Sequence, residues 1–270
     1  VTRGLPPDAA VAAGLEPNPV MKDSGVDWLG EVPRHWHVDR LKWSTKGCYN
    51  GVWGDEPNEI DDLICVRVAD FDRDRFIVIS SPPTIRAIET GQRRNRILQK
   101  NDLLIEKSGG GEKQLVGCVV QFTEDLPAVC SNFVARLPVA SGCNARYLTY
   151  LHSTIYAARL NYPAIKQTTG IQNLDSSEYL NISVAYPPIP EQAAIAAYLD
   201  AQSAQIDTLL AKTEAAITRL AEYRQALITS AVTGKIDVRG WTQQHKAGGK
   251  AFGAPNNTIK TEAAQAGLVA

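Results

Sequence analysis

The stretch YPPIPEQAAIAAYLD at residues 186–200 separates two kinds of sequence in this chain. Prolines stand at 187, 188 and 190, and the chain then has no glycine or proline until Gly234. Proline suits the first turn of a helix, and glycine is common just past a helix end. The pattern therefore predicts one long helix within residues 191–233, from Glu191 to about Ala231.

Apolar side chains recur along this helix at alternating steps of three and four residues, which is the spacing of a coiled-coil seam. An isolated helix would leave such a stripe in water, so we expect the helix to pair with a partner helix. The residues predicted to form the helix pairing are Ile195, Leu199, Ile206, Leu209, Leu220 and Leu227.

The residues before the helix predict a different architecture. Short β-branched runs such as LICVRVADF (63–71), DLLIEK (102–107) and LVGCVVQF (115–122) alternate with turn-rich segments and indicate strands. Residues 144–160 have helical spacing. The expected fold class is a mixed α/β (α+β) domain over residues 21–190, followed by the long helix. Residues 1–20 are interpreted as a linker or arm, and residues 240–270 as a disordered tail.

The composition excludes several classes of protein. The net charge is −1, so the chain does not coat nucleic acid through bulk charge, although a local basic face is possible. The five cysteines are scattered and never form CxxC, which favours reduced thiols in a cytoplasmic protein. No apolar run approaches the ~20 residues that span a bilayer, and there is no signal-peptide pattern. We expect a cytoplasmic location and no membrane partner.

The chain lacks the common sequence signatures of catalysis. It contains no GxxxxGK[ST], GxGxxG, HExxH or GxSxG motif, so no catalytic, cofactor-binding or metal-binding residue is predicted. Acidic residues cluster at Asp61–Asp62 and at Asp70, Asp72 and Asp74. A solvated loop edge explains these acids better than a metal site, because no matching Glu/Lys constellation follows.

A local excess of cations suggests a nucleic-acid contact. Residues 67–113 contain ten Arg or Lys and seven Asp or Glu, most densely in GQRRNRILQK (91–100), and a second polar set lies in AIKQTTGIQNL (164–174). Arg and Lys contact phosphates or guanine, and Asn and Gln suit adenine. An ordinary solvated loop is the alternative. The candidate DNA contacts are Arg67, Arg93, Arg94, Arg96, Lys107, Lys113, Lys166, Gln167, Thr168, Gln172 and Asn173.

An ordered set of segments, which begins with MKDSGVDWLGEVPRHWHVDRLKW (21–43) and ends with PPIPEQ (187–192), resembles a known family. This family comprises the specificity (S) subunits of type I restriction-modification enzymes. The opening MKDSGVDWLGEVPRHWHVDRLKW (21–43) resembles the start of a DNA target recognition domain. The segments that follow in the order of the family are NGVWGDEP (50–57), CVRVADFD (65–72), DLLIEKSGGGEKQLVG (102–117), CSNFVARL (130–137) and GIQNL through PPIPEQ (170–192). The resemblance covers about residues 21–239.

The resemblance implies a division of labour. The recognition domain would read one half of a split sequence in double-stranded DNA, and the long helix would pair with a counterpart and dock methyltransferase (M) subunits. The S subunit would have no catalytic residues and no cofactor of its own. S-adenosylmethionine would be bound by the M subunits, and ATP by restriction (R) subunits that join through them.

This sequence departs from the family in one respect, because it contains one recognition domain and one helix where an S subunit usually has two of each. We expect a half-sized subunit or the second half of a longer one. It would act as a homodimer or pair with another S half, and self-pairing would select an inverted repeat in the DNA. The alternatives are a coiled-coil protein adapter and, less favoured, a metal-dependent nuclease that uses the acids at 61–74.

Overall fold

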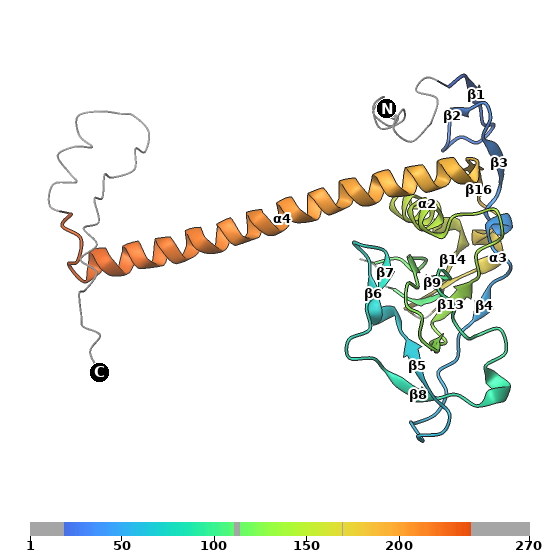
Figure 1. Cartoon of the computed structure of the whole chain (residues 1–270), viewed down its shortest axis with the longest axis horizontal. Coiled ribbons are helices and arrows are strands. Elements are labelled where there is room, and N and C mark those ends of the chain that lie inside the picture. The colour runs from blue at the N-terminus through green and yellow to red at the C-terminus, as the bar shows by residue number, and fades with distance from the viewer. Residues whose placement is uncertain (1–18, 111–113, 169, 239–270) are drawn as a thin grey trace, which may run out of the picture. The chain divides into compact units, whose positions relative to one another are not determined.

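The computed structural model describes residues 19–110, 114–168 and 170–238 (Figure 1). The chain forms two compact units that meet between Ala204 and Gln205. The first unit is a mixed α/β domain, and the second contains the greater part of one long helix. The predicted fold class is therefore confirmed, whereas coiled-coil pairing stays a prediction. The predicted tail at 240–270 and most of the predicted arm at 1–20 lie outside the described residues.

A six-stranded sheet forms the centre of the first unit. Its strands lie in the order β4-β13-β9-β11-β7-β6, and all neighbours are antiparallel except β11 and β7. The strands are β4 (Tyr49–Asn50), β6 (Phe71–Asp72), β7 (Ile77–Val78), β9 (Leu103–Glu106), β11 (Val119–Gln121) and β13 (Val134–Leu137).

The middle of this sheet is buried on both faces. In β9, Leu103 and Ile105 contact one hydrophobic cluster, and Leu104 between them contacts a second cluster on the other face. Successive side chains of a strand point to opposite faces, so both faces of β9 need apolar residues. This explains why the strand segments are almost continuously apolar in sequence.

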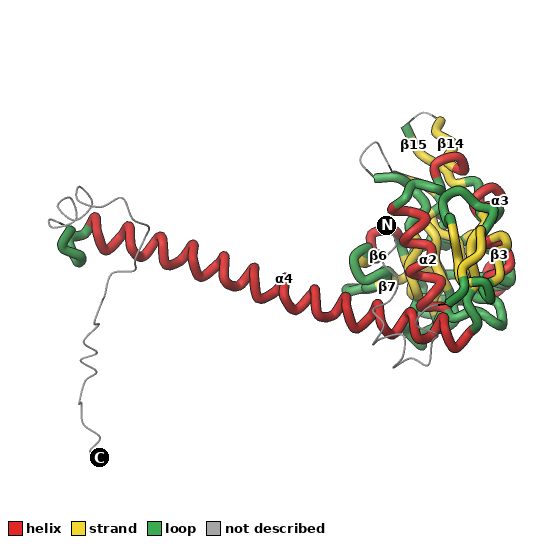
Figure 2. Tube along the Cα trace, turned by 90° about the horizontal axis from the view of Figure 1, so that it is seen from above, coloured by secondary structure: helices red, strands yellow, loops and turns green. Residues whose placement is uncertain are grey.

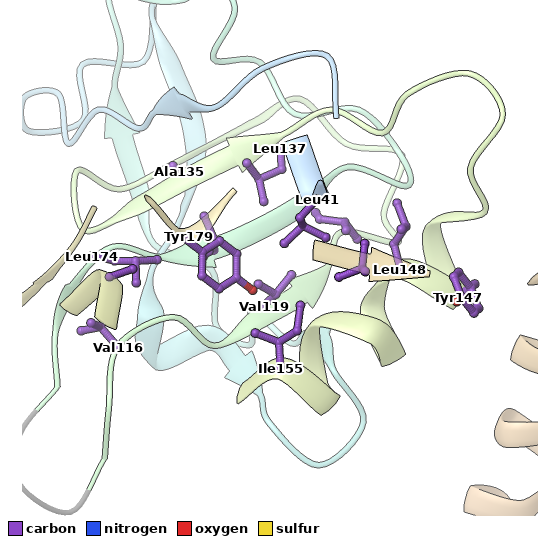
Figure 3. Close-up of a cluster of buried hydrophobic side chains, with 14 of the residues drawn as sticks. Leu41, Val116, Val119, Ala135, Leu137, Tyr147, Leu148, Ile155, Leu174 and Tyr179 are labelled. Atoms are coloured by element: carbon purple, nitrogen blue, oxygen red, sulfur yellow. The ribbon is translucent and has the colours of Figure 1, made fainter. Parts of the chain in front are cut away.

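The first cluster lies between the sheet and helix α2 (Ala145–Ala157), as Figure 3 shows. The side chain of Asn144 caps α2 by accepting a hydrogen bond from the Tyr147 amide at 3.0 Å. Leu148 and Ile155 are fully buried and belong to the same helix face, as the spacing of the sequence predicted. Tyr179 fills the centre of this cluster.

The second cluster is covered by a smaller sheet with the strand order β12-β5-β8. In it β5 pairs parallel with β12 and antiparallel with β8. Two further pairs stand near the start of the domain, β1 with β2 and β3 with β16. The strands are β1 (Met21–Asp23), β2 (Glu31–Pro33), β3 (His37–Arg40), β5 (Asp62–Val66), β8 (Ile85–Ala87), β12 (Ala128–Cys130) and β16 (Ser183–Tyr186).

A third sheet has the order β10-β15-β14 and ends in a hairpin, which Figure 2 shows. It consists of β10 (Ser108–Gly109), β14 (Ile165–Thr168) and β15 (Ile171–Leu174). The short helix α3 (Ser176–Tyr179) follows directly and is capped by Asp175, whose carboxylate accepts from the amides of Ser177 and Glu178.

Helix α4 runs from Ile189 to Val232, two residues earlier than the predicted start, so Pro190 lies in its first turn as expected (Figure 1). Residues 189–204 belong to the first unit. Gln192 is buried there: its amide nitrogen donates to the Pro187 carbonyl and its oxygen accepts from the Asn144 amide, both at 2.8 Å. Gln192, which follows the prolines in the sequence, therefore attaches the start of α4 to the domain.

Two further contacts reinforce this attachment. Glu191 accepts from Trp36 Nε1 at 3.0 Å, and its other oxygen lies 2.8 Å from His35 Nε2. Ile195 packs against the core of its own domain. Ile195 is only partly buried by this contact, so its pairing with another helix stays a prediction.

We predict a pH-dependent stability that originates at His152. Its Nδ1 lies 2.7 Å from the hydroxyl of Tyr179, and burial lowers the pKa of His152 to about 3. Below pH 6.5 the unfolded chain binds a proton that the folded chain does not, so stability falls as the pH drops from 6.5 towards 3. The free energy of unfolding in urea should fall by about 1 kcal/mol between pH 7.5 and 5.5 on account of this residue.

The variant His152→Gln should lose that part of the pH dependence, even though its stability at neutral pH is lower. His37→Gln is the matched control, since His37 is exposed, and should keep the slope of the unaltered chain. An equal slope in His152→Gln and the unaltered chain would contradict the prediction.

Candidate nucleic-acid interface

The segment NGVWG (50–54) is held against the two sheets by its glycines. A Cβ atom on Gly51 would collide with the carbonyl oxygens of Cys130 and Ser131. Gly54 has a φ of +66°, and a Cβ there would collide with the carbonyl of Ala87. Only glycine allows this close approach of backbones. The segment therefore has a fixed path, which places the side chains of Asn50 and Trp53.

Asn50 joins two of the predicted DNA contacts. Its side-chain oxygen accepts from Lys107 Nζ at 2.9 Å, and its backbone carbonyl accepts from Arg96 Nε at 3.1 Å. Arg96 also donates from Nη1 to the carbonyl of Gln92 at 2.8 Å. Two cations that are eleven positions apart in the chain thus converge on one asparagine.

The glycine-rich segment and the polar loop, which are far apart in sequence, belong to the same sheet. Ser108 and Gly109 of β10 pair with Asn173 and Gln172 of β15. The Ser108 hydroxyl also donates to Asn173 Oδ1 at 2.6 Å. Lys107 precedes β10 directly, so it lies next to this hairpin sheet. We call the surface formed by Asn50, Arg96, Lys107, Ser108 and Asn173 the polar face.

Not all predicted residues of the hairpin are available at the surface. Gln172 is only 4% exposed, and its side-chain oxygen accepts from the Val116 amide at 3.2 Å. Its assignment as a DNA contact is corrected, because its amide group is used to hold the segment that returns from the glycine-rich loop. Gln167 is exposed, and Lys166 is exposed and paired with Asp175 at 2.6 Å. For Thr168 only the backbone is described, and Lys113 lies outside the described residues.

The three clustered arginines differ in their surroundings. Arg93 donates from Nε to the Ile88 carbonyl and from Nη2 to Asp61, at 2.8 and 2.7 Å. It therefore supports the fold of its own loop, as does Arg96. Arg94 is exposed and forms no hydrogen bond or ion pair within the described part of the chain, so its charge is fully available to a ligand.

Arg67 lines an open cleft beside the polar face. The cleft has a volume of about 820 Å³ and is bordered by two partly exposed aromatic side chains, Trp53 and Phe133. The backbone of Phe133 accepts hydrogen bonds from the amides of Lys107 and Ser108 at 2.8 and 3.2 Å. The cleft and the polar face are therefore connected through the backbone.

One residue that lines the cleft, Glu106, is held in an ion pair. Glu106 is 1% exposed, and its carboxylate accepts from Arg73 Nη2 at 2.7 Å. Burial raises the pKa of Glu106, although the neighbouring Arg73 opposes this shift. An unpaired carboxylate in the cleft would repel phosphate groups. Because Glu106 is paired with Arg73, its negative charge is compensated.

Four residues of this site were not among the predicted contacts: Asn50, Trp53, Ser108 and Phe133. Asn50 and Trp53 lie in NGVWGDEP, and Phe133 lies in CSNFVARL. A usable signal was the pair of glycines around Trp53, since glycine positions often mark a close backbone approach. For Phe133, an exposed aromatic residue within a buried strand segment, no such signal was present.

The acidic clusters serve local structure. Asp62 accepts from the amides of Asn58 and Glu59, and Asp72 from those of Asp74 and Arg75. Asp61 pairs with Arg93, and Asp70 with Arg67. Over the described ranges no three His, Cys, Asp or Glu side chains are grouped so as to hold a metal ion. The nuclease alternative gains no support from these residues.

The second unit presents a row of apolar side chains on α4. Ile206, Leu209, Leu220 and Leu227 are each 45–66% exposed within the chain. Leu210 and Ile217 beside them are 56% and 61% exposed. A continuous exposed row of this kind is typical of a helix that binds another helix. No described helix is both long enough and apolar enough to cross a membrane.

Comparison with known proteins places this architecture in a family. Residues 72–219, more than half of the chain, match the model of the type I restriction modification DNA specificity domain. The chain belongs to this family, which agrees with the resemblance seen in the sequence. Its fold is a mixed α/β domain followed by a long helix.

Individual relatives agree with this assignment. The specificity subunit of the type I restriction enzyme EcoKI from Escherichia coli (strain K12) is 27% identical over 154 residues, which are 55% of this chain and 32% of that protein. A chain from a structural study of assembly and conformational transition in the type I R-M system matches with a TM-score of 0.50 and 21% identity, over 74% of this chain and 46% of that one.

The HsdS subunit from Thermoanaerobacter tengcongensis matches with a TM-score of 0.46 and 21% identity, over 85% of this chain and 50% of that one. The chain thus spans about a third of the curated relative and about half of each solved chain.

We predict that Gly51→Ala destabilises the domain strongly. The added methyl group cannot avoid two backbone carbonyls, so the NGVWG segment must move away from β12 and β13. We expect a loss of about 2–3 kcal/mol in the free energy of unfolding, measured in urea.

Gly91→Ala is the matched control, because a Cβ there meets nothing within 4 Å and the φ angle does not lie in the left-handed region. It should change the stability by less than about 0.5 kcal/mol. Equal stabilities of the two variants would show that the NGVWG segment is not held as tightly as described.

Proposed function

We propose that this chain is a non-catalytic DNA-recognition subunit of a type I restriction-modification complex. Residues 21–190 read one half of a bipartite target, and the long helix assembles the complex. The observation that carries the proposal is the convergence of two separate polar segments on one surface, through Ser108–Asn173 and through Asn50 with Arg96 and Lys107. The family membership supports the same function.

The surface offers two kinds of contact with a duplex. Arg94, Lys107 and Lys166 are cations on long flexible side chains, which suit phosphate oxygens and fix the position of the protein without reading sequence. The hairpin of β14 and β15 adds Gln167 and Asn173, whose amides can pair with base edges. The width of the hairpin suits the major groove, which admits a two-stranded ribbon.

The exposed row on α4 supports pairing with a second long helix. The partner is a second copy of this chain or another S half, and a two-fold pair would recognise an inverted repeat. The 44 residues of α4 span roughly 66 Å at ~1.5 Å per residue. That length corresponds to roughly nineteen base pairs of B-DNA, which is enough to separate two half-sites by one helical turn or more.

The remaining parts of the reaction belong to other subunits in this proposal. M subunits dock on the helix and supply S-adenosylmethionine, and R subunits join through them and supply ATP-driven cleavage. This chain contributes recognition and spacing. The coiled-coil adapter remains the rival function, because an exposed apolar row by itself requires only a protein partner. Salt dependence of DNA binding distinguishes the two.

We predict a steep loss of DNA affinity with rising salt, measured by fluorescence anisotropy on a duplex pool. The logarithm of the binding constant should fall with a slope of about −0.9 per phosphate contacted. Arg94→Ala should weaken binding to all duplexes alike and reduce the slope by about 1. Arg34→Ala is the control, since this arginine is exposed and lies outside the proposed surface. If the chain binds no duplex sequence more tightly than random DNA, the proposed function is wrong.

We also predict that Leu209→Asp combined with Leu220→Asp prevents self-association. Both side chains are more than 60% exposed in the isolated chain and would be buried in a helix pair, where a carboxylate is costly. Light scattering after size exclusion should report a smaller particle than for the unaltered chain. Ala211→Asp, on the opposite side of the heptad, should leave the particle size unchanged. Unchanged mass in the double variant would refute pairing through this row.

A further inference from the structure

Arg67 differs from the other arginines in how it is held. It lies between β5 and a 3-10 turn at Val68–Asp70. The carboxylate of Asp70 accepts from Arg67 Nη2 at 2.8 Å, from Nε at 3.3 Å and from the Arg67 backbone amide at 2.8 Å. Asp70 is only 5% exposed, so the carboxylate that orients the guanidinium is itself fixed by burial.

The count of hydrogen-bond donors shows what remains available. A guanidinium has five N–H donors in a planar fork. Asp70 uses the Nε donor and one donor of Nη2, which leaves both donors of Nη1 and one donor of Nη2. These lie along the outer edge of the fork, and two parallel donors of this kind match the O6 and N7 acceptors of guanine. The Arg67 side chain is 41% exposed, so this edge is open to a ligand.

Three other paired arginines, Arg73, Arg93 and Arg136, do not offer the same edge. Arg136 is bound to Asp102 and is 9% exposed at its side chain, so it is buried. Arg73 is 26% exposed and is directed at the buried Glu106. Arg93 uses both donors of Nη2, one for the carbonyl and one for the carboxylate of Asp61, so this nitrogen has no donor left for a ligand.

The surroundings of Arg67 favour a base edge over a phosphate. Trp53 and Phe133 border the same cleft and are 39% and 47% exposed. The guanidinium of Arg86 lies 4.8 Å from the centre of the Trp53 ring and holds the indole in place. Apolar side chains on both sides exclude water from a hydrogen bond made between them. An N–H donor of Arg67 that finds no acceptor on the ligand then costs more free energy than it would in water. Ser108 and Gly109 line the same cleft.

We propose that Arg67, oriented by Asp70 at the edge of the Trp53–Phe133 cleft, reads a guanine of the DNA target through its O6 and N7 atoms in the major groove. This inference rests on the proposed function, since it requires that the surface binds duplex DNA. Asp70 is the positioning residue. Arg94, by contrast, binds phosphate and carries no information about sequence.

The test is a selection from a random duplex pool by the full chain, alone and with methyltransferase subunits of the same source. The unaltered chain should enrich a motif that contains a guanine. Arg67→Lys keeps the charge but loses the fork, so it should lower the preference for guanine at one position by roughly 10- to 100-fold. The preferences at the other positions should stay the same. Arg94→Lys, the matched exchange at an unpaired arginine, should leave the whole motif unchanged.

Modified bases give a second measurement that does not depend on the stability of a variant. Replacement of that guanine by 7-deazaguanine removes N7 and should weaken binding of the unaltered chain by about tenfold. The same replacement should have little effect on Arg67→Lys. Inosine keeps O6 and N7 and should bind as guanine does.

The outcomes separate the two proposals. An unaltered chain that enriches no motif overturns the proposed function and this inference with it. A motif that contains no guanine overturns this inference alone. So does a motif that Arg67→Lys selects unchanged, or a loss of affinity in Arg67→Lys that is equal for all duplexes.

Discussion

The burial of β9 on both faces is the constraint on which the rest of the first unit depends. Its side chains enter two hydrophobic clusters alternately, so a shift by one residue would exchange the clusters and leave Glu106 without Arg73. The strand ends at Glu106, and Lys107 and Ser108 follow at once. The core thereby fixes where the chain leaves the sheet and where the polar face begins.

Buried contacts also fix the start of α4 on its domain. A helix that starts after two prolines and has a third in its first turn has a stiff approach, but stiffness alone does not fix the direction of the helix. Gln192 supplies the direction, because both ends of its buried amide are bonded to the domain, one to the segment before the helix and one to the start of α2. Hydrogen bonds in a buried position are costly to break, so the first turns of the helix form part of the domain.

Much of the fold could be predicted from the sequence, and the reasons are physical. The short apolar, β-branched runs within 102–107 and 115–122 indicated strands, and their apolar residues reflect burial on two sides. The long helix was evident from its heptads and its prolines. The packing of Ile195 against the core of its own domain could not be predicted, since a coiled-coil seam residue and a core residue have the same spacing along a helix. Only the tertiary contact separates the two.

The candidate site was harder to predict for a different reason. Arg93, Arg94 and Arg96 look alike in sequence, but two of them are engaged by backbone carbonyls and one is exposed. Gln172 resembled a surface amide and is buried, because it lies on the inner face of β15 together with Leu174, whereas Ile171 and Asn173 lie on the exposed face. Charge and polarity predict the composition of a binding surface. They do not predict which donors are already used within the fold.

The separation between buried strands and exposed ends has a consequence for how such a protein can change over time. Residues such as Arg94, Gln167 and Phe133 lie at the surface, where a substitution costs little stability. The central strands β9 and β13, by contrast, are buried and tolerate few changes. A lineage of such proteins can therefore acquire a new binding preference by drift at a few exposed positions, with its folding and its assembly untouched.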